Sequence, residues 1–253
     1  MNWNLKKNIK LSGVQILALG FVVIILVGTI LLTLPISTAS GESTSFLDAL
    51  FTATSAVCVT GLIVVDTGSY WNMFGQTIIM ILIEIGGLGF MSFTTLIAII
   101  LGKKITLRER LILQDAMNTF NIQGLVKMVK YVLVFTVSVQ FFGALLLSTQ
   151  FIPEFGFGKG AFYSLFHSIS AFCNAGFDVL GKGNSLISFN TNVVVIMVLS
   201  ILIIIGGLGF TVWSELYTCK SIRRVSIHSK MVLLITTGLV VGGTLLMFLF
   251  EHN

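Results

Sequence analysis

Five long apolar segments run along the chain, separated by shorter polar stretches. Each is at least as long as the ~20 residues that a helix needs to cross a bilayer. Pro35 directly follows the first segment, as is typical just past a helix end. We expect membrane-spanning helices at Gly13–Leu34, Asn72–Leu101, Val126–Phe151, Thr191–Tyr217 and Lys230–Phe250.

Two shorter apolar segments, Phe46–Val57 and Ala161–Phe172, interrupt this pattern. Each has 12 residues, or about 18 Å as helix, which is about half the thickness of the hydrocarbon layer. Ser45 and Asp48 fit a capping box at the start of the first segment, whereas the second follows Gly160 without such a cap. Because each lies between two long segments, we expect the chain to enter the membrane as a short helix and return to the same side.

The chain repeats itself. The stretch "FLDALFTATSAVCVTG" at 46–61 aligns with "AFYSLFHSISAFCNAG" at 161–176, and "IGGLGF" occurs at both 85–90 and 205–210. Each unit therefore reads span, half-helix, loop, span. The expected divisions are 1–101 as the first pore repeat, 102–125 as a cytosolic amphipathic connector, 126–217 as the second repeat, and 218–253 as a cytosolic link with the first span of a third repeat.

Composition agrees with a membrane protein. Charged residues make up 10% of the chain and the mean hydropathy is +1.01, whereas soluble domains carry about 25% charged residues. All 15 Lys and Arg except Lys159 and Lys182 fall on one side if each long helix crosses once. The positive-inside rule makes that side, with the N-terminus, cytoplasmic. The acidic outer side is either a solvated loop or a vestibule that concentrates cations, and nothing resembles a nucleic-acid-binding surface.

The loops after the half-helices carry the candidate chemistry. Non-helical backbone at membrane depth is tolerated where it is buried or lines water, and its carbonyls are free to coordinate an ion. The negative ends of the half-helices also favour a cation. Carbonyl ligands suit a weakly hydrated monovalent ion better than Ca²⁺ or Mg²⁺, although an ordinary interfacial loop is the plainer alternative. The predicted ion-binding residues are Val57, Cys58, Val59, Thr60, Gly61, Phe172, Cys173, Asn174, Ala175 and Gly176.

These motifs resemble a known family. The loops "VCVTGL" and "CNAGF", the first span "LGFVVIILVGTILLTLP" and the repeated "IGGLGF" closely resemble the KtrB-type subunits of the Ktr/Trk/HKT superfamily. The resemblance implies an all-α membrane protein of the bacterial plasma membrane, with five transmembrane helices plus two re-entrant pore helices here. It implies four filter loops around a central pore, with K⁺ as the transported ion and Na⁺ as a second candidate. Because Gly61 stands in the first loop, K⁺ is favoured.

The resemblance also implies partners. A cytosolic nucleotide-binding ring of the KtrA or KtrC type would dock on the inner face, where the segment 102–124 reads as an amphipathic helix. Lying on lipid headgroups is the alternative for that helix. We further expect a homodimer in the lipid bilayer, and no nucleotide site in this chain. The family has four units and this chain carries two and a fraction, so we expect the front part of a longer protein rather than a natural half-transporter.

Other residues are open to two interpretations. Glu84 lies in mid-membrane, where a structural hydrogen bond or subunit contact is favoured over a place on the ion path. The glycines of "IGGLGF" are interpreted as close-packing positions rather than a gating hinge, His167 as a packed histidine, and Asn174 as a residue that orients the second loop. No enzyme constellation is visible. A carrier with inverted repeats and a non-conducting fragment are the rival functions.

Overall fold

The computed structural model describes residues 13–89, 125–181, 185–219 and 225–251. Apart from an isolated bridge between Thr38 and Trp71, these residues form helices and loops. The elements are α1 (Gly13–Thr33), η1 (Pro35–Ser37), α2 (Phe46–Val57), α3 (Thr67–Tyr70), α4 (Met73–Leu88), α7 (Leu125–Phe155), α8 (Phe157–Phe172), η2 (Ile187–Phe189), α9 (Val193–Gly207), α10 (Phe210–Cys219) and α11 (Ile227–Glu251).

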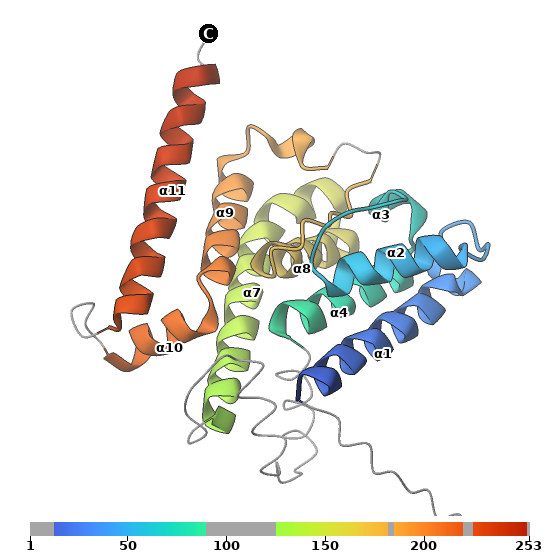
Figure 1. Ribbon diagram of the computed structural model, residues 1–253. Coiled ribbons are helices and arrows are strands. Elements are labelled where there is room, and N and C mark those ends of the chain that lie inside the picture. Colours follow the sequence, from blue (N-terminus) through green and yellow to red (C-terminus); the bar gives the residue numbers. More distant parts are fainter. Residues whose placement is uncertain (1–12, 90–124, 182–184, 220–224, 252–253) are drawn as a thin grey trace, which may run out of the picture. The chain divides into compact units, whose positions relative to one another are not determined.

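The chain forms two compact units. The first comprises Met1–Lys130 and Ala175–Ser188, so it holds α1, α2 and α4, which pack side by side (Figure 1). They meet at Gly28 of α1, where an added methyl group would lie 2.7 Å from Leu82 Cδ1 and 3.4 Å from Ala53 Cβ. The glycine therefore lets the first span approach the other two helices closely.

The second unit comprises Tyr131–Asn174 and Phe189–Asn253. It repeats the same packing around Gly143 of α7, where a methyl group would lie 2.6 Å from Ser168 Oγ and 2.8 Å from Leu202 Cδ1. Ser168 Oγ also donates a hydrogen bond of 2.7 Å to the carbonyl of Gln140. In each unit a glycine of the opening span thus lies against one residue of the short helix and against a leucine of the closing span.

The closing spans begin alike as well. Asn72 caps α4 by accepting hydrogen bonds from the amides of Phe74 and Gly75. Asn192 caps α9 in the same way, by accepting hydrogen bonds from the amides of Val194 and Val195. An asparagine is a favoured N-cap because its side chain satisfies amides that lack helical partners. The internal repeat seen in the sequence is therefore also a repeat of caps and packing contacts.

Several predicted helix bounds are confirmed and others need correction. The first span and the first short helix agree with the predictions, including the cap in which Ser45 Oγ accepts from the amide of Asp48 at 3.2 Å. The second short helix is longer than predicted, because it begins at Phe157 after Gly156 rather than at Ala161. The third predicted span extends to Phe155 and includes Pro153 in its last turn.

The closing spans are not the uninterrupted helices that the apolar pattern predicted. The helix predicted as Asn72–Leu101 ends at Leu88, where Gly89 has φ +78°, and residues 90–101 lie outside the described part. The helix predicted as Thr191–Tyr217 consists of α9 and α10, which are bent by 92° at the break. Glycine tolerates the positive φ of +85° at position 209 that this break requires.

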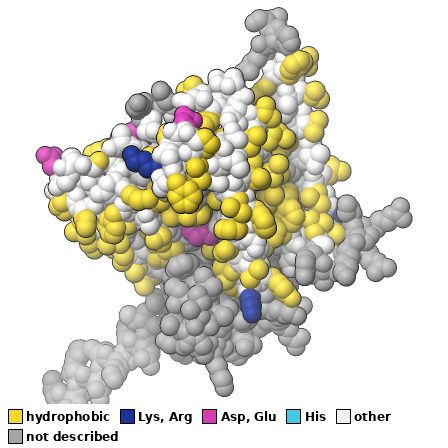
Figure 2. Space-filling model, turned by 180° about the vertical axis from the view of Figure 1, so that it is seen from behind, with side chains coloured by type: hydrophobic (Ala, Val, Ile, Leu, Met, Phe, Trp, Pro, Cys, Tyr) yellow, Lys and Arg dark blue, Asp and Glu magenta, His cyan; other side chains and the backbone are white. Residues whose placement is uncertain are grey.

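Among the described residues, three helices are long and apolar enough to cross a membrane, at Gln15–Thr33, Val129–Phe155 and Ile227–Phe250, or four if the bent pair is one span. The last is covered least, and Leu234 and Leu239 are 75% and 71% exposed. Figure 2 shows hydrophobic side chains gathered in broad areas of one face, where the charged side chains are few and isolated. Such a surface suits lipid, or further helices, rather than water. The connector 102–125 lies almost wholly outside the described residues.

Candidate functional site

The first candidate loop leaves α2 with its amide groups tied back to that helix. The amide of Cys58 donates to Thr54 O at 2.8 Å, and the amide of Val59 donates to Ala56 O at 3.2 Å. Val59 has φ +56° and Gly61 has φ +70°. A positive φ at a β-branched residue is a rare conformation that costs of order 1–3 kcal/mol and persists where the surroundings enforce it.

The second loop has the same backbone. Cys173 ends α8 with φ −74° and ψ −5°, close to the −83° and 0° of Cys58. Asn174 and Gly176 then have φ of +60° and +73°, which matches the alternation at Val59 and Gly61. The two loops share their first residue, cysteine, and their last, glycine, but differ at the two residues between them, and both have adopted the same unusual backbone conformation.

The carbonyl groups of the first loop are available. Within the described part of the chain, no hydrogen-bond donor reaches the carbonyl oxygens of the four residues 58–61. Residues 58–61 are exposed or half-buried, so these four carbonyls are open to water or to an ion. The C-terminal end of α2 adds negative potential at the same place.

Ser55 of α2 holds the first loop in place by hydrogen bonds to its later residues. The residue is 4% exposed, and its hydroxyl donates to Leu62 O at 2.7 Å and lies 2.9 Å from Thr60 Oγ1. The amide of Thr60 donates in turn to Ser55 O at 2.9 Å. Sequence reasoning missed this residue, although the repeat places a second serine, Ser170, at the matching position.

The two loops meet at their glycines. A methyl group on Gly61 would overlap the carbonyl oxygen of Ala175, whereas a methyl group on Gly176 would meet only Gly61 Cα, at 3.9 Å. Ala175 is 1% exposed. The structure thus brings together two predicted site residues that are far apart in the sequence, and leaves no room for a side chain at the first of them.

The last carbonyl of each short helix faces a closing span instead. A methyl group on Gly86 of α4 would overlap Val57 O, and one on Gly206 of α9 would overlap Phe172 O. Each carbonyl therefore lies directly against the backbone of a glycine. Close packing was predicted for all three glycines of each "IGGLGF", and these contacts agree with it at the first glycine. The third glycine, Gly89 or Gly209, instead has a positive φ just past the last residue of its helix.

The return path from the first loop is held by polar side chains that sequence reasoning also missed. Gln76 is 5% exposed and donates to the carbonyls of Thr67, Gly68 and Trp71. Asn72 Nδ2 donates to Ile36 O and to Thr38 O at 2.6 and 3.0 Å. The one available signal was Asn72 itself, because an asparagine precedes both closing spans.

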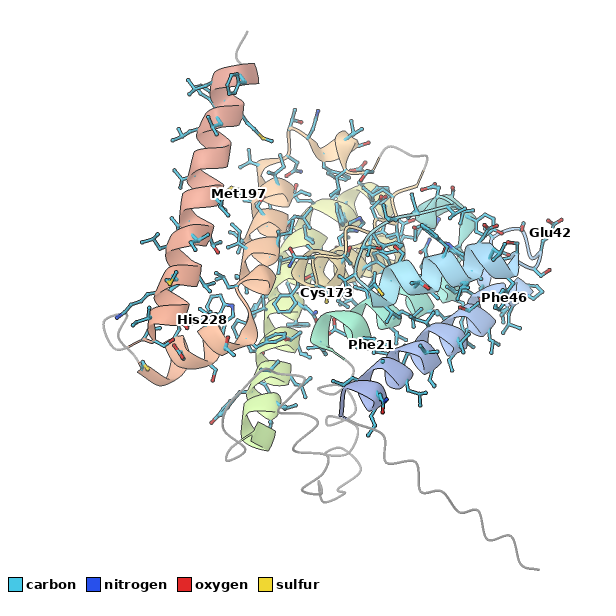
Figure 3. The ribbon with its side chains drawn as sticks, viewed as in Figure 1. Phe21, Glu42, Phe46, Cys173, Met197 and His228 are labelled. Carbon is cyan, nitrogen blue, oxygen red and sulfur yellow. The ribbon has the colours of Figure 1, made fainter. Side chains whose placement is uncertain are left out.

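The remaining predicted residues lie as follows. Asn174 Nδ2 makes long hydrogen bonds of 3.4 Å to Phe172 O and Ile203 O, so its amide ties the second loop to α9. His167 is 3% exposed, with Nδ1 2.7 Å from Tyr163 O and its ring against Phe151. Cys173, at the end of α8, is labelled in Figure 3. Glu84 is half-buried on α4, and its role stays a prediction. The described residues include no group of three or more His, Cys, Asp or Glu that could hold a metal ion.

Comparisons with known proteins identify the family of the chain. A family model described as cation transport protein, TrkH, matches residues 6–248. The chain is 50% identical over 98% of its length to the potassium/sodium uptake protein NtpJ of Enterococcus hirae. It is 44% identical over 98% of its length to the Ktr system potassium uptake protein B of Bacillus subtilis, and 40% identical over 94% to that of Vibrio alginolyticus.

The chain spans about half the length of these curated relatives, covering 55%, 55% and 52% of them in turn. Their names describe transport proteins and not enzymes. The family model covers nearly all of this chain, and the apolar helices α1, α7 and α11 are long enough to cross a bilayer. This multi-pass membrane chain therefore belongs to the TrkH family of cation transport proteins.

Proposed function

We propose that this chain contributes two filter loops to a pore that admits K⁺ and disfavours Na⁺. The observation that carries the proposal is the pair of loops with one backbone conformation, meeting at Gly61 and Ala175. Rings of carbonyl oxygens replace the hydration shell of K⁺ in selective pores. The relatives named for potassium uptake support the same ion, and the name of one of them adds sodium.

The set of carbonyls that we propose to face the ion is smaller than the set that the sequence predicted. Val57 O and Phe172 O lie against the glycines of the closing spans, so they are turned toward protein and not toward a pore. We therefore assign the ion-binding role to the backbone of residues 58–61 and 173–176. The side chains contribute by holding this backbone, as Ser55 does for the first loop.

The expected partners follow from the family. We propose a homodimer in the bacterial plasma membrane, and a cytosolic nucleotide-binding ring of the KtrA or KtrC type on the inner face. The support is the name of the relatives, which are components of Ktr systems, and the basic segments at 103–110 and 220–230 that we expect on the inner side. Any control by nucleotide would belong to that ring.

The test is uptake by the reading frame that encodes this chain, in bacteria that lack their own K⁺ systems. We expect rescue of growth at low K⁺. Gly61→Ser should lower the preference for K⁺ over Na⁺ by about tenfold, or roughly 1.4 kcal/mol of discrimination, because the new side chain would displace Ala175 O. The measurement is competition of Na⁺ and K⁺ against radioactive rubidium uptake.

Gly41→Ser is the matched control. Gly41 has φ +75° but nothing within 4 Å of an added methyl group, so it suffers the same backbone strain without the contact. Selectivity should survive this change. Failure of the unsubstituted protein to restore growth would contradict the K⁺ function, and equal Na⁺ and K⁺ uptake with Gly61 intact would contradict the filter assignment.

A further inference from the structure

The same unusual contact occurs once in each unit, directly behind a filter loop. In the first unit the carbonyl oxygen of Val57 lies against Gly86, and in the second unit that of Phe172 lies against Gly206. Both carbonyls belong to the last residue of a short helix. Both glycines are the first of the pair in "IGGLG".

The contact depends on the backbone and not on the side chains. Valine and phenylalanine differ in size and shape, yet their carbonyls meet a glycine in the same way. The two units form this contact with different surroundings, since Gly206 also has Asn174 Nδ2 nearby, at 3.3 Å from the added methyl position. What they share is a helix surface without a side chain, pressed against the peptide group where the filter begins.

Such a contact has a mechanical consequence for the loop. The peptide group after Val57 or Phe172 is the hinge from which the filter strand leaves its helix. With its oxygen held against a glycine Cα, where C–H···O contacts are weakly favourable, this peptide cannot rotate outward. Close-packed protein interiors yield little, so the next carbonyls keep their spacing. That spacing determines which ion can replace its water by carbonyl oxygens.

We propose that Gly86 and Gly206 are positioning residues for ion selectivity: they set the distance of each filter strand from the pore although they touch no ion. This inference rests on the proposed K⁺ function and names residues outside the loops that determine its specificity. A side chain at either position would push the last helical carbonyl, and with it the filter strand, away from the closing span.

The test compares two neighbouring glycines of α9. A methyl group on Gly206 would overlap Phe172 O, whereas one on Gly207 would meet only Asn174 Nδ2, at the ordinary distance of 3.8 Å. Both changes to alanine raise helix propensity by a similar amount. We expect Gly206→Ala to lower the K⁺-over-Na⁺ preference in rubidium competition by about tenfold, because its methyl group overpacks the contact with Phe172 O, and Gly207→Ala to leave it within about twofold.

Gly86→Ala repeats the test independently in the first unit. Immunoblotting of membranes measures whether each variant protein accumulates there. Loss of selectivity with continued uptake, in every one of these two variants that accumulates, supports the inference. Normal selectivity in a variant that accumulates and transports overturns it. It is also overturned if neither alanine variant accumulates while Gly207→Ala does, because the contact would then serve folding. No uptake by the unsubstituted protein would instead contradict the proposed function together with this inference.

Discussion

At the scale of single residues, one buried hydroxyl links a helix to the loop that follows it. Ser55 is in the last turn of α2, and its bonds to Leu62 O and Thr60 Oγ1 span the whole loop from 58 to 61. A serine inside a helix usually bonds its own backbone one turn earlier, as Thr54 does with Leu50 O at 2.7 Å. Ser55 instead stabilises the strained backbone at Val59.

Replacing Ser55 by alanine should therefore weaken both the fold and the loop. Leu62 O would lose its donor, but Leu62 is 60% exposed, so water can take the donor's place and the loss is that of one net hydrogen bond, about 0.5–1.5 kcal/mol. We expect a lower unfolding temperature in detergent and a lower apparent affinity for K⁺ in uptake assays.

Thr54→Ala is the control for Ser55→Ala, because its hydroxyl bonds only within α2. It should change the unfolding temperature slightly and the affinity for K⁺ hardly at all. Equal affinities for K⁺ in the two variants would show that the Ser55 bonds do not shape the filter.

At the scale of elements, the break in the second closing span is braced by one side chain. Trp213 Nε1 of α10 donates to Ile205 O of α9 at 2.9 Å, across the 92° bend. The indole ring also lies 5.1 Å from the ring of Phe135 on α7. Carbonyls in the last turn of a helix lack helical partners, so this tryptophan supplies a donor where the helix can no longer do so.

Trp213→Phe keeps an aromatic ring and removes the donor. We expect the angle between α9 and α10 to become more variable, with a loss of about 1 kcal/mol in the free energy of unfolding. Distances between spin labels placed on the two helices should show a broader distribution. Phe135→Leu separates the ring contact from the hydrogen bond, and an equal broadening in that variant would contradict a specific role for the bond.

At the scale of the whole molecule, charge and apolar surface together predict the orientation in the membrane. Exposed apolar side chains cover α1 and α11, and the Lys and Arg residues gather in alternate connections. From the charge pattern, Glu42, before the first short helix, and His228, at the start of α11, are expected on opposite sides of the bilayer; both are labelled in Figure 3. Both side chains are exposed.

Single cysteines at these two positions test the orientation. In intact cells, a membrane-impermeant maleimide should label Glu42→Cys, and it should label His228→Cys only after the cells are permeabilised. The labelling must exceed that of the unsubstituted chain, because Cys58 is itself exposed. The reverse pattern would place the N-terminus outside and contradict the positive-inside assignment.

Short-range signals explain what the sequence predicted correctly. The first span and the first short helix were predicted from apolar runs, from Pro35 and from the Ser45 cap. Each of these signals acts on residues that are only a few positions away in the sequence. The repeat of 46–61 at 161–176 likewise predicted that a short helix and a glycine-containing loop occur twice. The break at Gly209 was missed because apolar residues continue on both sides of it, and a bend leaves no mark in hydrophobicity. The early start of α8 was missed because it has no polar cap.

The sequence by itself determined that this is an apolar helical protein built from repeated units, each with a short helix and a glycine-containing loop. Only the tertiary structure decided what the glycines of the loops and of the closing spans contact. Gly61 faces Ala175 O while Gly176 has room beside it, and Gly86 and Gly206 face the last carbonyls of the short helices. The physical reason is that these contacts join backbone atoms far apart along the chain, and their closeness is decided by how the helices pack.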